Sequence, residues 1–224
     1  MAAGAGLLLT ITVRSAAVRV VAEAGRELAV RKGHIEADGA GRWRVESDHS
    51  SVEVECPEGT SLAIANTSGR IECRGEFGDV RITTSSGRVE IDRATEVDVR
   101  TTSGRVAIED CTGSCTIRTT SSRVEVGHAG DADVATTSGR ITLHEVTRLN
   151  AQSVSGSIHV TARASPDLSI RTMSAGVDVT LAPGSTPATD LRSTSGKVRT
   201  TCPSGHDGQV DVETGSGSIT VRCR

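Results

Sequence analysis

The sequence has 224 residues and a net charge of −3, with 25 Lys and Arg almost balanced by 28 Asp and Glu. Dedicated nucleic-acid binders carry a strongly basic surface, so this composition argues against that class of function. The only aromatic residues are Trp43 and Phe77. The core is therefore predicted to be thin and aliphatic, and there is little to stack against sugar rings. No stretch approaches the roughly 20 apolar residues of a transmembrane helix.

The first thirty residues alternate apolar and polar side chains, which is the pattern of a half-buried β-strand. We predict that residues 1–30 form a strand pair that caps the following repeats, because an open solenoid end exposes unpaired strand edges. The alternation also lacks the continuous apolar stretch of a secretory signal. Cytoplasmic residence is the expectation, with a cell-surface location as the alternative. The alternating apolar positions are Leu7, Leu9, Ile11, Val13, Val18 and Val20.

From residue 31 onward one short phrase returns, and its best-defined copies are 17 to 21 residues apart. Its clearest form is Ser-Gly-Arg followed by Val or Ile, with degenerate copies at Ser121 and Ser174 and fainter ones beginning at Lys32 and His49. Periods near 20 residues are typical of solenoids, whose units bury their apolar faces only by stacking. Residues 31–224 are predicted to form about eleven rungs. The other copies begin at Ser68, Ser86, Ser103, Ser138, Ser155, Ser195 and Ser216.

Each rung is predicted to hold two short strands joined by the Ser-Gly corner. Apolar residues alternate with polar ones on both sides of the Ser, and this period of two is that of a strand. Glycine at the corner accepts a positive φ or a close backbone approach that a side chain would obstruct. Since the repeat leaves no place for a boundary, residues 1–224 are predicted to form one all-β domain, an elongated β-solenoid. Examples of the apolar pairs are Val80/Ile82, Val97/Val99, Val106/Ile108 and Ile141/Leu143.

A column of small polar residues lies two positions before each repeat Ser and points inward by parity. Side chains stacked about 4.8 Å apart can hydrogen-bond up and down the stack, so the column is interpreted as a structural ladder. An ice-binding array would need a flat, outward Thr-x-Thr face, which adjacent Thr residues do not supply. The column contains Asn66, Thr84, Thr101, Thr119, Thr136, Ser153, Thr172, Ser193 and Thr214.

Arginine lies two positions after five of the repeat Ser residues and points outward by parity. A stack of these residues would form a basic stripe able to bind an anionic polymer or phospholipid headgroups. The next outward position is often acidic, as at Glu72, Glu90 and Glu125, and pairing would neutralise the row. A ligand-binding stripe and a self-paired surface are both open at this point. The five residues are Arg70, Arg88, Arg105, Arg123 and Arg140.

The spacing of two of the six cysteines suggests a covalent link. Cys202 and Cys223 each lie seven residues after a repeat Ser, so they are expected on adjacent rungs, where a disulfide is geometrically possible. Cys111 and Cys115 straddle a turn without the second ligand pair of a zinc site, so no metal is expected. Cys73 falls on an inward column as a small apolar residue. The cysteine usage favours a reducing compartment.

The sequence contains no recognisable catalytic motif: it lacks a Gly-x-Ser-x-Gly elbow, a phosphate loop and His-Glu-x-x-His. A β-helix lyase or hydrolase needs clustered carboxylates in a cleft. The available ones, Asp92, Glu109 and Asp110, lie near predicted turns without aromatic neighbours. The sequence therefore predicts a protein that is not an enzyme and binds no cofactor.

The repeated phrases resemble those of the bacterial putative-adhesin family, β-strand-repeat proteins of unknown function. They include Ser-Gly-Arg-Val-Glu-Ile at 86–91 and Thr-Thr-Ser-Gly-Arg-Val-Ala-Ile at 101–108, and the resemblance covers about residues 45–224. It implies a β-solenoid fold and brings no catalytic residues. This chain favours Arg after the Gly, where many relatives carry Asp or Lys.

Three functions are consistent with these features. The first is a non-catalytic structural scaffold or protein-interaction module, with a protein or envelope component as its partner. The second is an envelope or surface adhesin that binds an anionic polymer through the Arg stripe. The third is bactofilin-like self-assembly, because no cap follows the last predicted strand, residues 218–223, and this C-terminal end could pair with a second copy. No nucleic-acid partner is expected.

Overall fold

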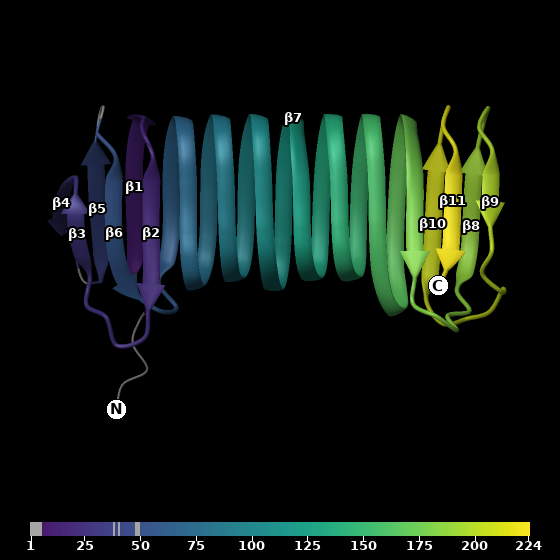
Figure 1. Ribbon diagram of the computed structural model, residues 1–224, viewed down its shortest axis with the longest axis horizontal. Helices are drawn as coiled ribbons and strands as arrows, with labels where there is room; N and C mark the ends of the chain where they lie inside the picture. Colours follow the sequence, from purple (N-terminus) through teal and green to yellow (C-terminus); the bar gives the residue numbers. More distant parts are fainter. Residues whose placement is uncertain (1–5, 38, 40, 48–49) are drawn as a thin grey trace. The chain divides into compact units, whose positions relative to one another are not determined.

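The computed structural model describes residues 6–37, 39, 41–47 and 50–224, and within them every regular element is a β-strand (Figure 1). The predicted all-β, solenoid-like fold is confirmed at this level. The chain divides into two compact units, residues 1–112 and 113–224, and each is described by itself; the single domain stays a prediction. None of the described residues belongs to a helix that could cross a membrane.

A long wound ribbon contributes to both units and supplies most of the second. This ribbon, β7 (Ser61–Leu181), begins in the first unit and ends in the second. The apolar positions predicted from the period of two are buried along it, which confirms the alternation. In residues 61–112 they include Leu62, Ile64, Val80, Ile82, Val89, Ile91, Val97, Val99, Val106 and Ile108. In residues 113–181 they include Cys115, Ile117, Val124, Val126, Ile141, Leu143, Ile158, Val160, Leu168, Ile170, Val177 and Val179.

The Ser-Gly corners bring successive turns of backbone very close together. A Cβ on Gly104 would lie 1.9 Å from the carbonyl oxygen of Gly87, and one on Gly156 would lie 1.9 Å from that of Gly139. Gly104 also has a φ of 125°, which residues with a side chain rarely adopt. Glycine is required at these corners for both predicted reasons.

Six shorter strands lie in the described part of the first unit. They are β1 (Leu8–Ser15), β2 (Val18–Glu23), β3 (Ala29–Lys32), β4 (His34–Ala37), β5 (Arg42–Ser47) and β6 (Val52–Pro57).

The order of these strands differs from the predicted one, in which residues 1–30 form the cap. β1 lies between β5 and β7, and β2 lies between β6 and β7, all in parallel register. The strand pair within residues 1–30 is therefore an inner layer rather than a cap. The outermost described strands of the first unit are β3 and β4, which pair antiparallel with β6 and β5. The faint corner predicted from His49 begins outside the described residues.

Four strands complete the second unit. They are β8 (Ala188–Ser193), β9 (Val198–Thr200), β10 (Gln209–Thr214) and β11 (Ile219–Cys223).

Their order corrects the prediction that the C-terminal strand is the open edge. β10 lies between β7 and β8, and β11 lies between β7 and β9, again in parallel register (Figure 1). Residues 201–208 carry the chain back across the rung, where the Asp207 amide donates to the Thr186 carbonyl at 2.9 Å. The open edge in the described part of this unit is therefore β8 and β9.

Candidate binding groove in residues 113–224

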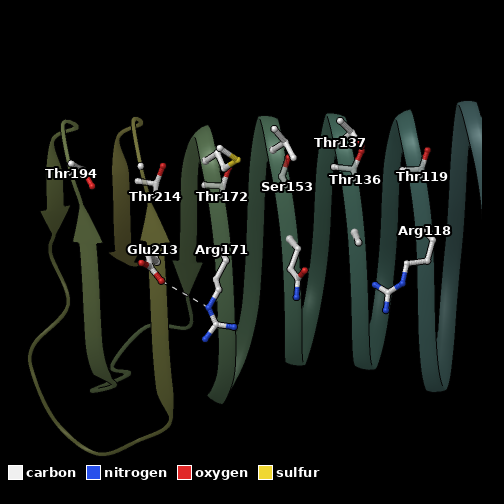
Figure 2. A pocket seen from close by; sticks show the side chains of 15 residues that line it. Arg118, Thr119, Thr136, Thr137, Ser153, Arg171, Thr172, Thr194, Glu213 and Thr214 are labelled. Carbon is white, nitrogen blue, oxygen red and sulfur yellow. Dashed lines mark ion pairs between the residues drawn. The ribbon is translucent and has the colours of Figure 1, made fainter.

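A shallow groove with a volume of about 690 Å³ runs across the rungs of the second unit. Figure 2 shows its side chains as rows that cross the strands. Its floor is the inward polar column described above, which lies just before the corners. The floor residues are Thr119, Thr136, Ser153, Thr172 and Thr214.

The residues on either side of the column form the two walls, because side chains one position before and after an inward residue both point outward. The wall next to the corners carries two exposed apolar side chains, Val154 and Met173, with 45% and 67% of their surface accessible. The preceding rungs carry Thr at the same position, as at Thr120 and Thr137, and the following rung carries Gly215. The groove is therefore apolar on one wall over two rungs.

The opposite wall contains charged residues that are already paired. Arg118 donates to Asp133, with a distance of 2.9 Å between Nη1 and Oδ1. Arg171 lies 3.9 Å from Glu213 on the adjacent rung (Figure 2). Since each Arg has a carboxylate beside it, this wall offers polar groups with little net charge.

The polar column is satisfied mainly within each corner. The hydroxyls of Thr101 and Ser153 donate to the carbonyl of the repeat Ser two residues further on, at 3.1 and 3.2 Å. Thr136 instead donates across the stack to the carbonyl of Thr120, at 3.4 Å. The ladder is therefore structural as predicted, but most of its described bonds do not run from rung to rung.

Two hydroxyls on the groove floor break this pattern. Thr172 and Thr214 occupy the same register position on β7 and β10, and they are 8% and 2% exposed. Neither hydroxyl has a hydrogen-bond partner among the described residues. An unsatisfied buried polar group costs about 1–3 kcal/mol. Both residues line the groove.

The arginine stripe is partly neutralised in the first unit. Arg70 lies 2.6 Å from Glu72 and 2.7 Å from Glu90, and Arg88 lies 3.6 Å from Glu90. The hydrogen bond from Arg70 lowers the pKa of Glu90, so this carboxylate stays charged over a wider pH range. These two arginines are therefore engaged by their own surface.

The other three stripe residues have different surroundings. Arg105 in the first unit is half-buried, whereas Arg123 and Arg140 in the second unit are exposed. Arg140 donates to the hydroxyl of Ser157 at 3.3 Å. The structure thus does not give the five arginines a common environment.

The cysteines fall into two groups. Cys202 and Cys223 are joined by a disulfide, with their Cα atoms 5.2 Å apart. The others are buried, and burial raises the pKa of Cys56 and Cys73, which keeps these two thiols protonated and unreactive. The described residues contain no group of three or more side chains suited to a metal ion. The buried cysteines are Cys56, Cys73, Cys111 and Cys115.

The sequence pattern predicted the inward polar column that forms the floor, but it did not predict the groove. The available signal is the change from Thr to Val154 and Met173 at the position just before the corner. The missing partners of the Thr172 and Thr214 hydroxyls leave no signal in the pattern.

These features define an all-β repeat protein of the β-solenoid type with a shallow groove across its rungs. The chain belongs to the Toastrack DUF4097 family, whose model matches residues 9–222. The family resemblance drawn from the repeated phrases is confirmed.

Comparison with solved structures finds a putative cell adhesion protein from Clostridium sporogenes, at 8% identity and a TM-score of 0.24. The alignment covers 98% of this chain and 94% of that one. A similarity this low carries no argument about fold or function. No curated protein matches the sequence.

Proposed function

We propose that this protein is a non-catalytic interaction module that holds an extended polypeptide segment in the groove of residues 113–224. One observation carries the proposal: the exposed side chains of Val154 and Met173 lie beside the unpartnered hydroxyls of Thr172 and Thr214. An extended peptide presents apolar side chains and backbone hydrogen-bonding groups together, so it suits both parts of this surface.

The composition of the groove favours a peptide over the other polymers. Residues 113–224 contain no aromatic residue, which leaves no platform for sugar rings. Arg118 and Arg171 are each close to a carboxylate, which weakens attraction for a polyanion. The alternative of an adhesin acting through the Arg stripe loses support for the same reason, because Arg70 and Arg88 face Glu90.

The disulfide supports the surface alternative for where the module acts. Stable disulfides form in oxidising compartments and are rare in the cytosol, and Cys202 is bonded to Cys223. We therefore propose an extracytoplasmic location. Thiol labelling of denatured protein taken from cells without reductant tests it: two protected thiols are expected, and six labelled thiols would contradict the proposal.

Selection from a random peptide library displayed on phage tests the groove. Enriched peptides are synthesised and titrated against the wild-type chain and the Met173→Glu variant. Because that substitution places a charge on the apolar wall, binding is expected to weaken about ten-fold or more, the effect of roughly 1.4 kcal/mol. The matched control is Thr102→Glu, at the equivalent exposed position before a corner in the first unit, and it should leave binding unchanged.

Two results would overturn the proposal. One is the absence of any peptide that binds the wild-type chain in solution. The other is a set of peptides whose affinity is the same for the wild-type chain and the Met173→Glu variant, since they would bind elsewhere.

A second candidate function is self-assembly through a sheet edge. The observation that favours it is the open edge formed by β8 and β9, which replaces the C-terminal strand as the candidate surface. Sedimentation of the full chain over a wide concentration range tests this function. The size of the assembly that it should detect depends on how the edge pairs.

A further inference from the structure

The outer strand β8 presents a row of backbone groups that its own sheet does not use. The amides of Ala188 and Thr194 donate inward to the carbonyls of Gly208 and Thr214, at 2.9 and 3.2 Å. In a parallel pair, alternate residues make both bonds to the neighbour, so the even-numbered residues of β8 face β10. The N–H and C=O groups of Thr189, Leu191 and Ser193 therefore point away from the sheet. This edge can accept another strand.

The same edge leaves the end of the apolar core incompletely covered. Leu191 lies in register with the buried Val212, and Val198 lies in register with the buried Ile219. Yet Leu191 is half-exposed and 42% of the surface of Val198 is accessible. One more rung would remove these apolar side chains from water, which favours association at about 25 cal/mol per Å² of apolar surface buried.

The outward face of β8 carries a charge pattern that is complementary to itself. Asp190 and Arg192 lie on either side of Leu191 and pair with each other, with 2.6 Å between Oδ2 and Nη2. If two β8 strands met antiparallel with Leu191 at the centre, Asp190 of each would face Arg192 of the other. These would be non-hydrogen-bonded positions, where side chains approach most closely. Leu191 would pair with its own copy through both backbone bonds.

We propose that two copies of this chain associate head to head through the β8–β9 edge, with β8 antiparallel to its copy and centred on Leu191. The inference deepens the second candidate function, self-assembly, and is independent of the groove. Such a contact uses the same patch on both copies, so it closes as a dimer and does not extend into a filament.

The outer edge of the first unit argues against a head-to-tail contact. A filament would require β8 to pair with β3 or β4, the outermost strands at that edge. β3 contains a register shift between Val30 and Lys32, and bulges of this kind disfavour further pairing. Arg31 and Lys32 add charge to the same strand. The β3 edge is therefore poorly suited to pair with β8, whereas a second copy of β8 offers a matching edge.

Charge exchange across the proposed two-fold axis gives the decisive experiment. Asp190→Arg and Arg192→Asp each place like charges opposite each other, so each variant alone should dimerise about ten-fold more weakly than the wild-type chain. An equimolar mixture should form heterodimers, because arginines of one copy then face aspartates of the other. The double variant Asp190→Arg/Arg192→Asp is again self-complementary and should recover the wild-type dissociation constant. Sedimentation equilibrium on the full chain measures all four.

Each result has a definite meaning. Recovery in the mixture and in the double variant supports the proposed pairing. A strict monomer at all concentrations overturns both this inference and the self-assembly function. Masses that grow beyond the dimer with concentration support self-assembly but overturn the head-to-head pairing. A dimer that is insensitive to the charge exchanges overturns the Leu191-centred register.

The groove proposal can be separated from this one with the same proteins. Met173→Glu should leave the dimer unchanged, and the residue 190 and 192 variants should leave peptide binding unchanged, because neither position lines the groove.

Discussion

The sheet ends differently in the two units. In the first unit the outer rung, β5 and β6, is covered by the antiparallel strands β4 and β3, and its core residues Val45 and Val54 are fully buried. In the second unit the outer rung, β8 and β9, has no further strand among the described residues, and Val198 remains accessible. A stack of similar rungs thus ends either by adding strands of a different direction or by leaving an edge open.

Each end has its own means of holding the outer rung in place. In the first unit, Glu55 of β6 lies 2.6 Å from Arg31 of the covering strand and also pairs with Arg26. In the second unit, the disulfide joins Cys202, just beyond β9, to Cys223 of β11. The covered end uses ionic contacts, whereas the open end uses a covalent bond.

The largest expected effect comes from removing this covalent bond. The Cys202→Ser/Cys223→Ser variant should lose about 3 kcal/mol in free energy of unfolding, because the loop of 21 residues is no longer closed in the unfolded chain. Urea titration measures the loss. The variant should be insensitive to reductant, while the wild-type chain should fall to its level when reduced.

Hydrogen exchange locates that effect. Without the disulfide, amide protection should decrease in residues 198–201 and stay unchanged in β6, in the other unit. An equal decrease in both places would mean that the bond stabilises the fold globally and does not act on the open edge.

The next effect compares one substitution at the two edges. Val54→Ala should cost about 2 kcal/mol, because it leaves a cavity in a covered core. Val198→Ala should cost less than about 0.5 kcal/mol, because that side chain is already partly in water. The paired urea titrations are done at low protein concentration, where association does not contribute. Equal costs would show that something covers Val198 in solution.

The smallest effect concerns the ionic contact at the covered edge. Hydrogen bonding from Arg31 lowers the pKa of Glu55, so the carboxylate stabilises the folded state at pH values above its unfolded pKa of about 4.3. This contribution is lost as the pH falls through the lowered folded value. Glu55→Gln should therefore be slightly less stable than the wild-type chain at pH 7, and the difference should vanish in acid.

Thermal melts across this pH range measure the difference, and Glu58→Gln is the control, because Glu58 is exposed on the turn after β6. A Glu55→Gln deficit that persists unchanged in acid would contradict the assigned origin of the effect.

The repeat pattern was enough to predict the strands, the inward columns and the corners, because each follows from local alternation and from glycine. It did not predict which rungs are neighbours. Val18 and Val20 have the same alternation as Val52 and Val54, and every such strand offers the same backbone groups. The pattern therefore allows a strand to pair with the next rung or with the one beyond it.

The groove was less accessible to prediction than the fold. Its floor follows from the Thr column, but Thr172 and Thr214 have the same residue type and position as the partnered Thr101 and Thr136, so the pattern does not show that their hydroxyls lack partners. The disulfide between Cys202 and Cys223 was suggested by equal spacing from the repeat Ser. The structure brings these residues together because β11 lies directly beside β9.

The interleaved strand order also has a consequence for how the protein is made. β8 and β9 pair only with β10 and β11 among the described strands, and these partners are synthesised after them. Residues 188–200 therefore emerge from the ribosome without a neighbour and must wait while the following segment is translated. A chain interrupted between the two, for example by a premature stop codon, would leave this rung unpaired and exposed to proteases and chaperones.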